Sequence, residues 1–171
     1  MILDYPANLY TLSYKERKTY LFAFLFIVGN IALPQLCHLA PGGGLTWLPI
    51  YFFTLIAAYK YGIRVGLLTA ILSPIANNLL FGMPAAPMLP IILIKSVLLA
   101  SVAAYIAHRT SKISLLSLLV VILAYQVIGT TIEWIMVQDF YIAVQDFRMG
   151  IPGMLVQLFG GYAILRWMAK L

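Results

Sequence analysis

Lys95 and Glu133 are charged side chains that fall inside long apolar runs of this sequence. An ionised side chain within a membrane span costs roughly 2.5 to 3.5 kcal/mol on insertion scales, so each needs a partner or a wet cavity. At about 1.5 Å per helical residue, Lys95 lies about 12 Å below the start of its run at Pro87, and Glu133 about 6 Å from the end of its own. The two side chains can therefore reach each other. A purely structural ion pair and a pair that also contacts a ligand both fit this spacing.

Further polar and aromatic groups fall at similar depths. Asn77 and Asn78 precede a Pro/Gly-rich corner, Gln157 comes five residues after Pro152, and Gln126 is deeper. Adjacent helical residues point about 100° apart, so only one of the two asparagines can face a pocket squarely while the other caps the corner. These groups gather in one half of the predicted membrane, which predicts a pocket open on that side. Tryptophans near an interface also occur simply as an aromatic belt, an alternative that applies to Trp47 and Trp134.

The elements that position these groups are predicted from composition. The chain has 171 residues, of which 63% are hydrophobic and only 9% charged, so its solvent is lipid. We expect an all-α integral membrane protein, a compact bundle of six transmembrane helices in a single domain, residues 1–171, with 1–18 as an N-terminal interfacial segment. At about 20 residues each, helices of this kind cross a hydrocarbon core of about 30 Å. The six segments are roughly 19–39, 45–60, 64–82, 87–107, 113–137 and 151–168.

The basic residues predict the orientation. With the N-terminus in the cytoplasm, nine of the eleven Lys and Arg residues fall on the inner side, as the positive-inside rule requires. The C-terminus is then cytoplasmic as well, and the outer loops are 41–44, 82–87 and 138–150. The net charge of +6 is scattered through short loops, so it does not indicate nucleic-acid binding.

Motifs for other chemistry are missing from the sequence. It has no Walker loop, no GxSxG, no HExxH and no Cys/His metal spacing, so we expect no enzyme, no cofactor and no metal site. Small residues do recur at helical spacing, as in Gly66 with Ala70 and in the row Ser96, Ala100 and Ala104. Such rows serve either packing inside the bundle or docking of a partner helix.

The run GLLTAILSPIANNLLFGMPAAPMLPIILIK, Gly66 to Lys95, resembles the third helix, outer loop and fourth helix of the S components of energy-coupling factor (ECF) transporters. The resemblance implies capture of a vitamin or similar micronutrient at the outer face of a bacterial or archaeal plasma membrane. The implied partners are lipid, a transmembrane T component and two cytoplasmic ATPase subunits. In that family the pocket uses the first outer loop and the outer ends of helices four to six. The implied substrate-binding residues are Lys95, Glu133, Trp47, Asn78, Trp134 and Gln157.

Two features differ from the family pattern. The small residues of the first helix are Ala23, Gly29 and Ala32 instead of AxxxA, and Lys95 stands where related sequences often carry an acidic residue. A free Lys95 favours a ligand with an acidic group, whereas a Glu133 that also contacts ligand favours a zwitterion or an amine. The alternative is a structural scaffold of the rod-shape-determining type, which needs no charged outer pocket. A second alternative is a membrane enzyme. It would need a nucleophile and a base within reach of each other, and the predicted outward cluster has no such pair.

Overall fold

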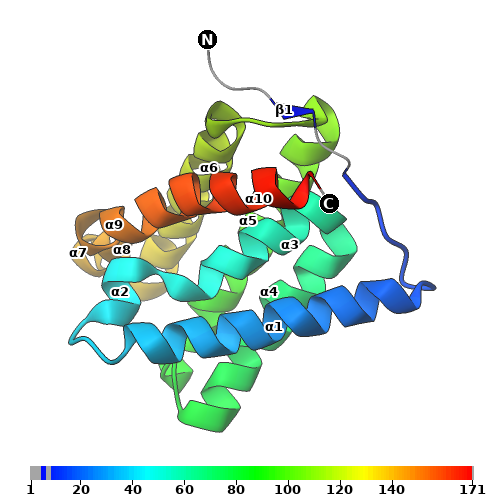
Figure 1. Ribbon diagram of the computed structural model, residues 1–171. Coiled ribbons are helices and arrows are strands. Elements are labelled where there is room, and N and C mark those ends of the chain that lie inside the picture. The colour runs from blue at the N-terminus through cyan, green and yellow to red at the C-terminus, as the bar shows by residue number, and fades with distance from the viewer. Residues whose placement is uncertain (1–4, 7–8, 171) are drawn as a thin grey trace.

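Helices make up most of this computed structural model, which describes residues 5–6 and 9–170 (Figure 1). Residues 1–4 and 7–8 of the predicted interfacial segment lie outside the described residues. Four α-helices are long: α1 (Arg17–Cys37), α4 (Ile63–Phe81), α5 (Leu89–Thr110) and α6 (Leu115–Val137). The others are shorter: α2 (Gly43–Trp47), α3 (Phe52–Tyr61), α7 (Phe140–Ala143), α8 (Gln145–Met149), α9 (Ile151–Leu155) and α10 (Gly161–Met168). Short 3₁₀ turns, η1 (Pro49–Tyr51) and η2 (Ala86–Met88), precede α3 and α5, and a π-helical turn, η3 (Val156–Gly160), joins α9 to α10.

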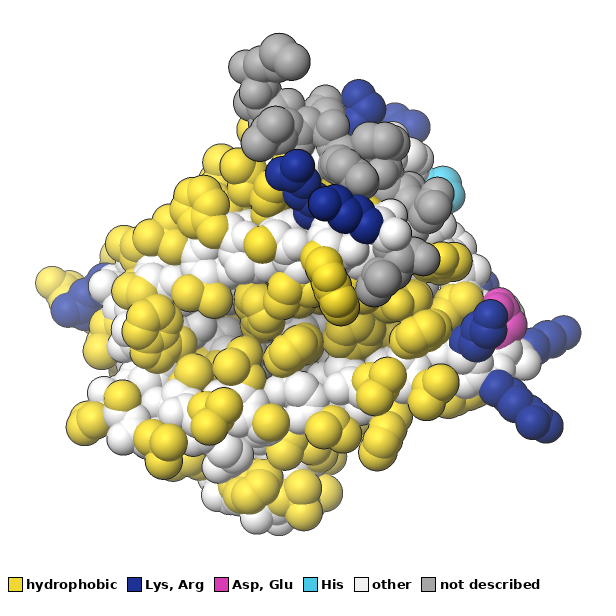
Figure 2. All heavy atoms as spheres, viewed as in Figure 1, with side chains coloured by type: hydrophobic (Ala, Val, Ile, Leu, Met, Phe, Trp, Pro, Cys, Tyr) yellow, Lys and Arg dark blue, Asp and Glu magenta, His cyan; other side chains and the backbone are white. Residues whose placement is uncertain are grey.

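In the described part of the chain, four helical stretches are long and apolar enough to cross a membrane. They are Arg17–Cys37, Ile63–Phe81, Ala86–Thr110, which joins η2 to α5, and Leu115–Val137. Large apolar side chains are exposed along them, for example Phe24 at 62% and Ile135 at 64%. A water-soluble surface would not expose apolar side chains so densely, and Figure 2 shows them spread over the face of the molecule in view. The structure is thus compatible with a multi-pass membrane protein.

The other two predicted spans are helical but interrupted. Within 45–60 the chain breaks at Leu48, which adopts a left-handed φ of 46°, and Pro49 then starts η1 and α3. Proline has no N–H to continue the preceding helix, so α2 must end there. In 151–168 the turn widens to π geometry over Val156–Gly160, between α9 and α10. Neither segment contains an unbroken helix of spanning length among the described residues, and the expected six spans are not confirmed.

Helix α3 occupies the centre of the molecule. Its residues from Phe52 to Tyr61 are buried except for the half-buried Phe53, because α1, α4, α5 and α10 pack around it. Figure 1 shows α3 running between α1 and α10. Leu55, Ile56 and Tyr59 are completely or almost completely buried there. This short central helix therefore fixes how the longer helices lie around it.

Asn30, near the middle of α1, connects three helices through a buried polar network. Its amide nitrogen donates to Thr54 Oγ1 at 2.9 Å, and its side-chain oxygen accepts from the backbone N–H of Phe53 at 3.1 Å. Asn77 of α4 donates to the Asn30 carbonyl at 2.9 Å. A helix leaves its first N–H groups without partners, so Asn30 acts as a long-range cap for α3.

One end of the bundle collects the beginning and the end of the described chain. Lys60 Nζ donates to the Met168 carbonyl at 3.0 Å, and Tyr10 N–H donates to the Lys60 carbonyl at 2.9 Å. At the same end Tyr59 OH donates to the Lys112 carbonyl, and β1 (Tyr5–Pro6) pairs antiparallel with β2 (Lys112–Ile113). Helices α2, α7, α8 and α9 gather at the opposite end (Figure 1).

The small residues singled out from the sequence pack inside the bundle. A Cβ built on Gly66 would lie 2.5 Å from Ala58 Cβ, 2.9 Å from Ala58 Cα and 3.3 Å from Ala100 Cβ. Gly66 therefore allows α4 to approach both α3 and α5 closely, as expected where lipid supplies no hydrophobic drive between helices. For Gly66 and Ala100, internal packing is thus the role that the structure supports.

We predict that Gly66→Val will lower the free energy of unfolding by about 1–3 kcal/mol, because the added methyl groups meet the backbone of α3. Thermal unfolding of the detergent-purified protein checks this. The control is Ala76→Val on the same helix. Gly82→Val would not serve, because Gly82 has a positive φ of 67° and valine would be strained there. Equal stability of the Gly66 variant and wild type would show that α3 and α4 are not in contact there.

Candidate functional site

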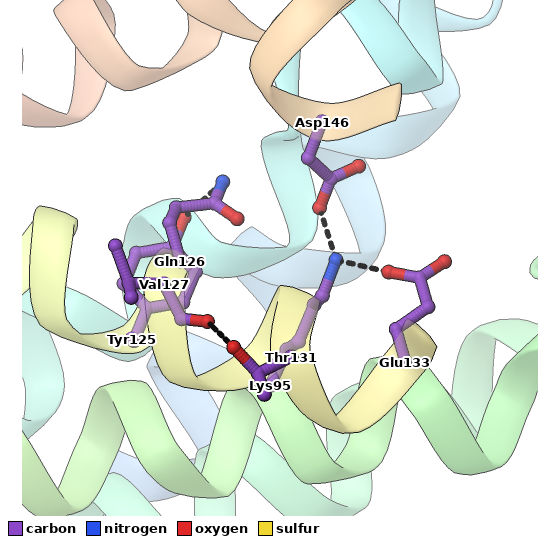
Figure 3. Close-up of polar contacts among 7 residues, drawn as sticks. All are labelled: Lys95, Tyr125, Gln126, Val127, Thr131, Glu133 and Asp146. Carbon is purple, nitrogen blue, oxygen red and sulfur yellow. Dashed lines mark hydrogen bonds and ion pairs between the residues drawn. The ribbon is translucent and has the colours of Figure 1, made fainter. Parts of the chain in front are cut away.

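Lys95 lies between two carboxylates. Its Nζ is 2.5 Å from Glu133 Oε2 and 2.7 Å from Asp146 Oδ2 (Figure 3). The Lys95 and Glu133 residues are 2% and 5% exposed, and the side chain of Asp146 is 13% exposed. The predicted Lys95–Glu133 pair is confirmed, and a third charged group joins it. We call Lys95, Glu133 and Asp146 the charged cluster.

Three elements bring the charged cluster together. Lys95 projects from α5 across Gly129 of α6, where an added Cβ would lie 2.7 Å from Lys95 Cγ. Glu133 lies one turn further along α6, on the same side as Gly129, because residues four apart share a helix face. Helix α6 ends at Val137, the following Gln138 adopts a left-handed conformation, and Asp139 then caps α7, so the chain turns back. This reversal places α8, and with it Asp146, beside α6.

A cavity of about 330 Å³ opens beside the charged cluster. Its walls come from the C-terminal end of α1, the loop and α2 that follow, η1, the corner before α5, and the first turns of α5. Most of these wall residues are apolar, and the charged cluster forms one side. The lining residues are Pro34, His38, Gly42, Gly44, Leu45, Leu48, Pro49, Ile50, Tyr51, Asn77, Met83, Pro84, Ala85, Met88, Ile91, Ile92, Lys95, Glu133 and Asp146. The cavity lies at the end of the bundle where the sequence places the outer loops.

Of the six predicted site residues, two line this cavity, namely Lys95 and Glu133. Trp47 is 43% exposed and Trp134 is 48% exposed, and neither is among the lining residues. The Trp134 ring instead packs edge-on against Phe140 at 5.5 Å. Both tryptophans thus occupy positions that suit the aromatic-belt alternative.

Asn78 and Gln157 also lie away from the cavity lining. Asn78 donates to the Pro84 carbonyl at 2.7 Å and so holds the corner, while its neighbour Asn77 lines the cavity. The angular separation of adjacent helical residues predicts that one asparagine faces the pocket and the other holds the corner. The predicted pocket residue was Asn78, whereas in the structure Asn77 has that position. Gln157 is fully buried in η3, where its Oε1 accepts from Tyr125 OH at 2.9 Å.

Gln157 belongs to a second buried polar group beneath the cavity. Gln126 Nε2 donates to Tyr125 OH at 3.3 Å, and the Tyr125 ring lies 5.5 Å from the ring of Tyr51, which lines the cavity. Gln126 Oε1, Gln157 Nε2, Thr130 Oγ1 and Ser96 Oγ have no hydrogen-bond partner among the described residues. Such atoms cost free energy when left dry, so this is a place where water molecules would bind.

A scan against protein-family models, a search of curated proteins and a search of solved structures found no match for this chain.

Sequence reasoning missed Asp146 and Tyr51 as cavity residues. Asp146 stands in a segment read as an outer loop, and nothing in its spacing to Lys95 shows that α8 folds back onto α5 and α6. A signal did exist, because QDFYIAVQDFRMG contains apolar residues between two acidic ones, and such a loop can pack on the bundle. The imbalance of one ammonium and two carboxylates comes only from the three-dimensional arrangement.

Proposed function

We propose that this chain is a membrane-embedded capture protein for a small organic solute, of the S-component type. It has six membrane segments, with α2–η1–α3 and α9–η3–α10 as the interrupted ones, and both termini lie in the cytoplasm of a bacterial or archaeal cell. A T component and two ATPase subunits complete the importer. The resemblance of residues 66–95 to S components supports the choice of family, and the cavity beside the charged cluster supports a role in ligand capture.

The observation that carries the proposal is the cavity of about 330 Å³ at the outer end, with buried charges on one wall. Ligand sites are typically concave and mostly apolar with a few placed polar groups, and this cavity has that composition. An ion pair serving only as a packing device has no need of an adjoining cavity, so the cavity weighs against the scaffold alternative. Tyr10, in the segment before α1, and Met168, the last residue of α10, both hydrogen-bond to Lys60, and this supports an even number of crossings.

The test is the thermal stability of the detergent-purified protein against a panel of vitamins and their precursors. A ligand at 100 times its Kd stabilises the folded state by about 2.7 kcal/mol. A raised Tm for one compound, with the same compound released from denatured protein in mass spectrometry, supports capture. No shift for any compound and no released molecule would favour the scaffold.

We predict that Ile92→Trp will weaken binding of the compound identified in the vitamin panel at least about tenfold, because Ile92 lines the cavity and the larger indole would fill part of it. Leu93→Trp is the matched control, since Leu93 is the next residue on α5 and is not among the lining residues. Titration with the ligand, followed by Tm or calorimetry, gives both affinities. Equal loss in the two variants would place the ligand elsewhere.

A further inference from the structure

In their ordinary ionised forms, the groups of the charged cluster carry one more negative than positive charge. Lys95 supplies one ammonium against the carboxylates of Glu133 and Asp146, and no other Lys, Arg, Asp or Glu is found among the described residues that line the cavity. Apart from this cluster, the ionisable side chains on the cavity walls are His38, which follows α1, and Tyr51 of η1. A net charge in a mostly apolar cavity is unfavourable unless a counter-charge compensates it.

Each carboxylate also keeps an oxygen for a further donor. Lys95 contacts Glu133 Oε2 and Asp146 Oδ2, whereas Glu133 Oε1 and Asp146 Oδ1 have no hydrogen-bond partner among the described residues. Figure 3 shows these second oxygens pointing away from the ammonium. Glu133 is only 5% exposed, yet it and Asp146 both line the cavity.

We propose that the cavity takes an organic cation, an ammonium group on an apolar body, with its N–H groups directed to Glu133 Oε1 and Asp146 Oδ1. The ligand cation restores neutrality, while its body contacts Ile92, Met88 and Leu48 on the apolar walls. A carboxylate ligand, which a free Lys95 would favour, would instead bring the cavity to two excess negative charges. This inference rests on the proposed capture function and names its substrate class.

A bare metal ion fits the cavity poorly. Calcium takes six to eight oxygen ligands, and Mg²⁺ demands octahedral geometry, whereas the charged cluster offers two free carboxylate oxygens. Within the described part of the chain no group of three or more His, Cys, Asp or Glu side chains could hold a metal ion. The volume of about 330 Å³ and the apolar walls also suit a molecule with a hydrocarbon body.

The test uses three probes that share a benzene ring on a two-carbon stem: 2-phenylethylamine, 2-phenylethanol and 3-phenylpropionate. Their dissociation constants are measured by thermal shift and calorimetry on the full-length protein in detergent at neutral pH. We expect the amine to bind about ten- to a hundredfold more tightly than the alcohol, the range of a charge-assisted hydrogen bond, and the carboxylate to bind weakest. Asp146→Asn, which keeps the shape and removes the excess charge, should reduce the amine's advantage about tenfold.

Two variants keep this test interpretable. If Asp146→Asn fails to fold, Glu133→Gln takes its place, and it should likewise reduce the preference for the amine over the alcohol about tenfold. Asp139→Asn is the control, because Asp139 caps α7 in the same outer segment, is not among the cavity-lining residues, and asparagine caps equally well.

Preference for the alcohol or the carboxylate would overturn the inference while leaving a capture pocket in place, as would an anionic hit in the vitamin panel. An amine preference that survives in both Asp146→Asn and Glu133→Gln would also overturn it. If no probe binds, the inference fails for this cavity. The proposed function fails with it only if the vitamin panel produces no shift either.

Discussion

Lys95→Met is expected to lower the free energy of unfolding by about 3–5 kcal/mol, the range found when one partner of a buried ion pair is removed. The methionine side chain fills much of the space of the lysine stem over Gly129, so the loss comes from charge and not from packing. The carboxylates of Glu133 and Asp146 would then lie close together at one side of the cavity with no cation between them. The measurement is thermal unfolding in detergent, where we expect Tm to fall by roughly 10 °C.

The triple variant Lys95→Met, Glu133→Gln, Asp146→Asn should recover most of this loss, because it removes all three charges together. Replacing a whole buried ion-pair network by neutral groups of similar size is often neutral or stabilising. Lys15→Met, at an exposed position before α1, should leave Tm unchanged. A single Lys95→Met variant as stable as wild type would mean that water or a counter-ion already screens the charged cluster.

The long helices could be predicted from the sequence because hydrophobicity alone decides them. The segments predicted at 64–82 and 113–137 agree with α4 and α6 within two residues at each end. The start near Pro87 falls within η2, where proline suits the first turn of a helix. In each case a continuous apolar run ends at Gly or polar residues, and local chemistry is sufficient.

The interrupted segments could not be predicted in the same way. Leu48 adopts a left-handed conformation that leucine rarely favours, and the structure around it holds it there: Gly153 lies so close that a Cβ would approach the Trp47 carbonyl at 2.4 Å. This contact between α2 and α9 joins segments about a hundred residues apart. Hydropathy reads 45–60 as one span because it does not register a break imposed by a distant part of the chain.

Site residues could be predicted where their position depends only on depth along a helix. They were missed where their position depends on how distant segments fold onto one another. Lys95 and Glu133 follow from spacing, because both lie a countable number of residues from a helix end. Asp146 and Asn77 depend on which way α8 and α4 present their side chains, which spacing does not determine. For Trp47 and Trp134 the family resemblance implied a binding role, but their exposure is what an aromatic belt at the interface would give.

Asn30→Leu is expected to destabilise the protein by about 2–4 kcal/mol, although leucine is more apolar and fits the composition of α1. The substitution removes the acceptor of the Phe53 N–H, in the first turn of α3, and the donor to Thr54 Oγ1. Loss of a cap costs about 0.5–2 kcal/mol, and a buried donor left without a partner costs about 1–3 kcal/mol. In lipid no water replaces the lost acceptor.

This loss should also reach the cavity. Asn77, one of its wall residues, donates to the backbone carbonyl of residue 30. Leucine keeps that carbonyl, but once α1 no longer caps α3 the carbonyl shifts and Asn77 moves with it. We therefore expect Asn30→Leu to lower both Tm and the affinity for the captured solute, whereas Ile92→Trp lowers affinity alone. Asn78→Leu is the comparison, since it removes the hydrogen bond to the Pro84 carbonyl at the half-buried corner and leaves α3 capped. Hydrogen exchange at the Phe53 amide provides the direct readout. If that amide remains as protected in Asn30→Leu as in wild type, α3 does not depend on α1 for its cap, and its central position must come from apolar packing alone.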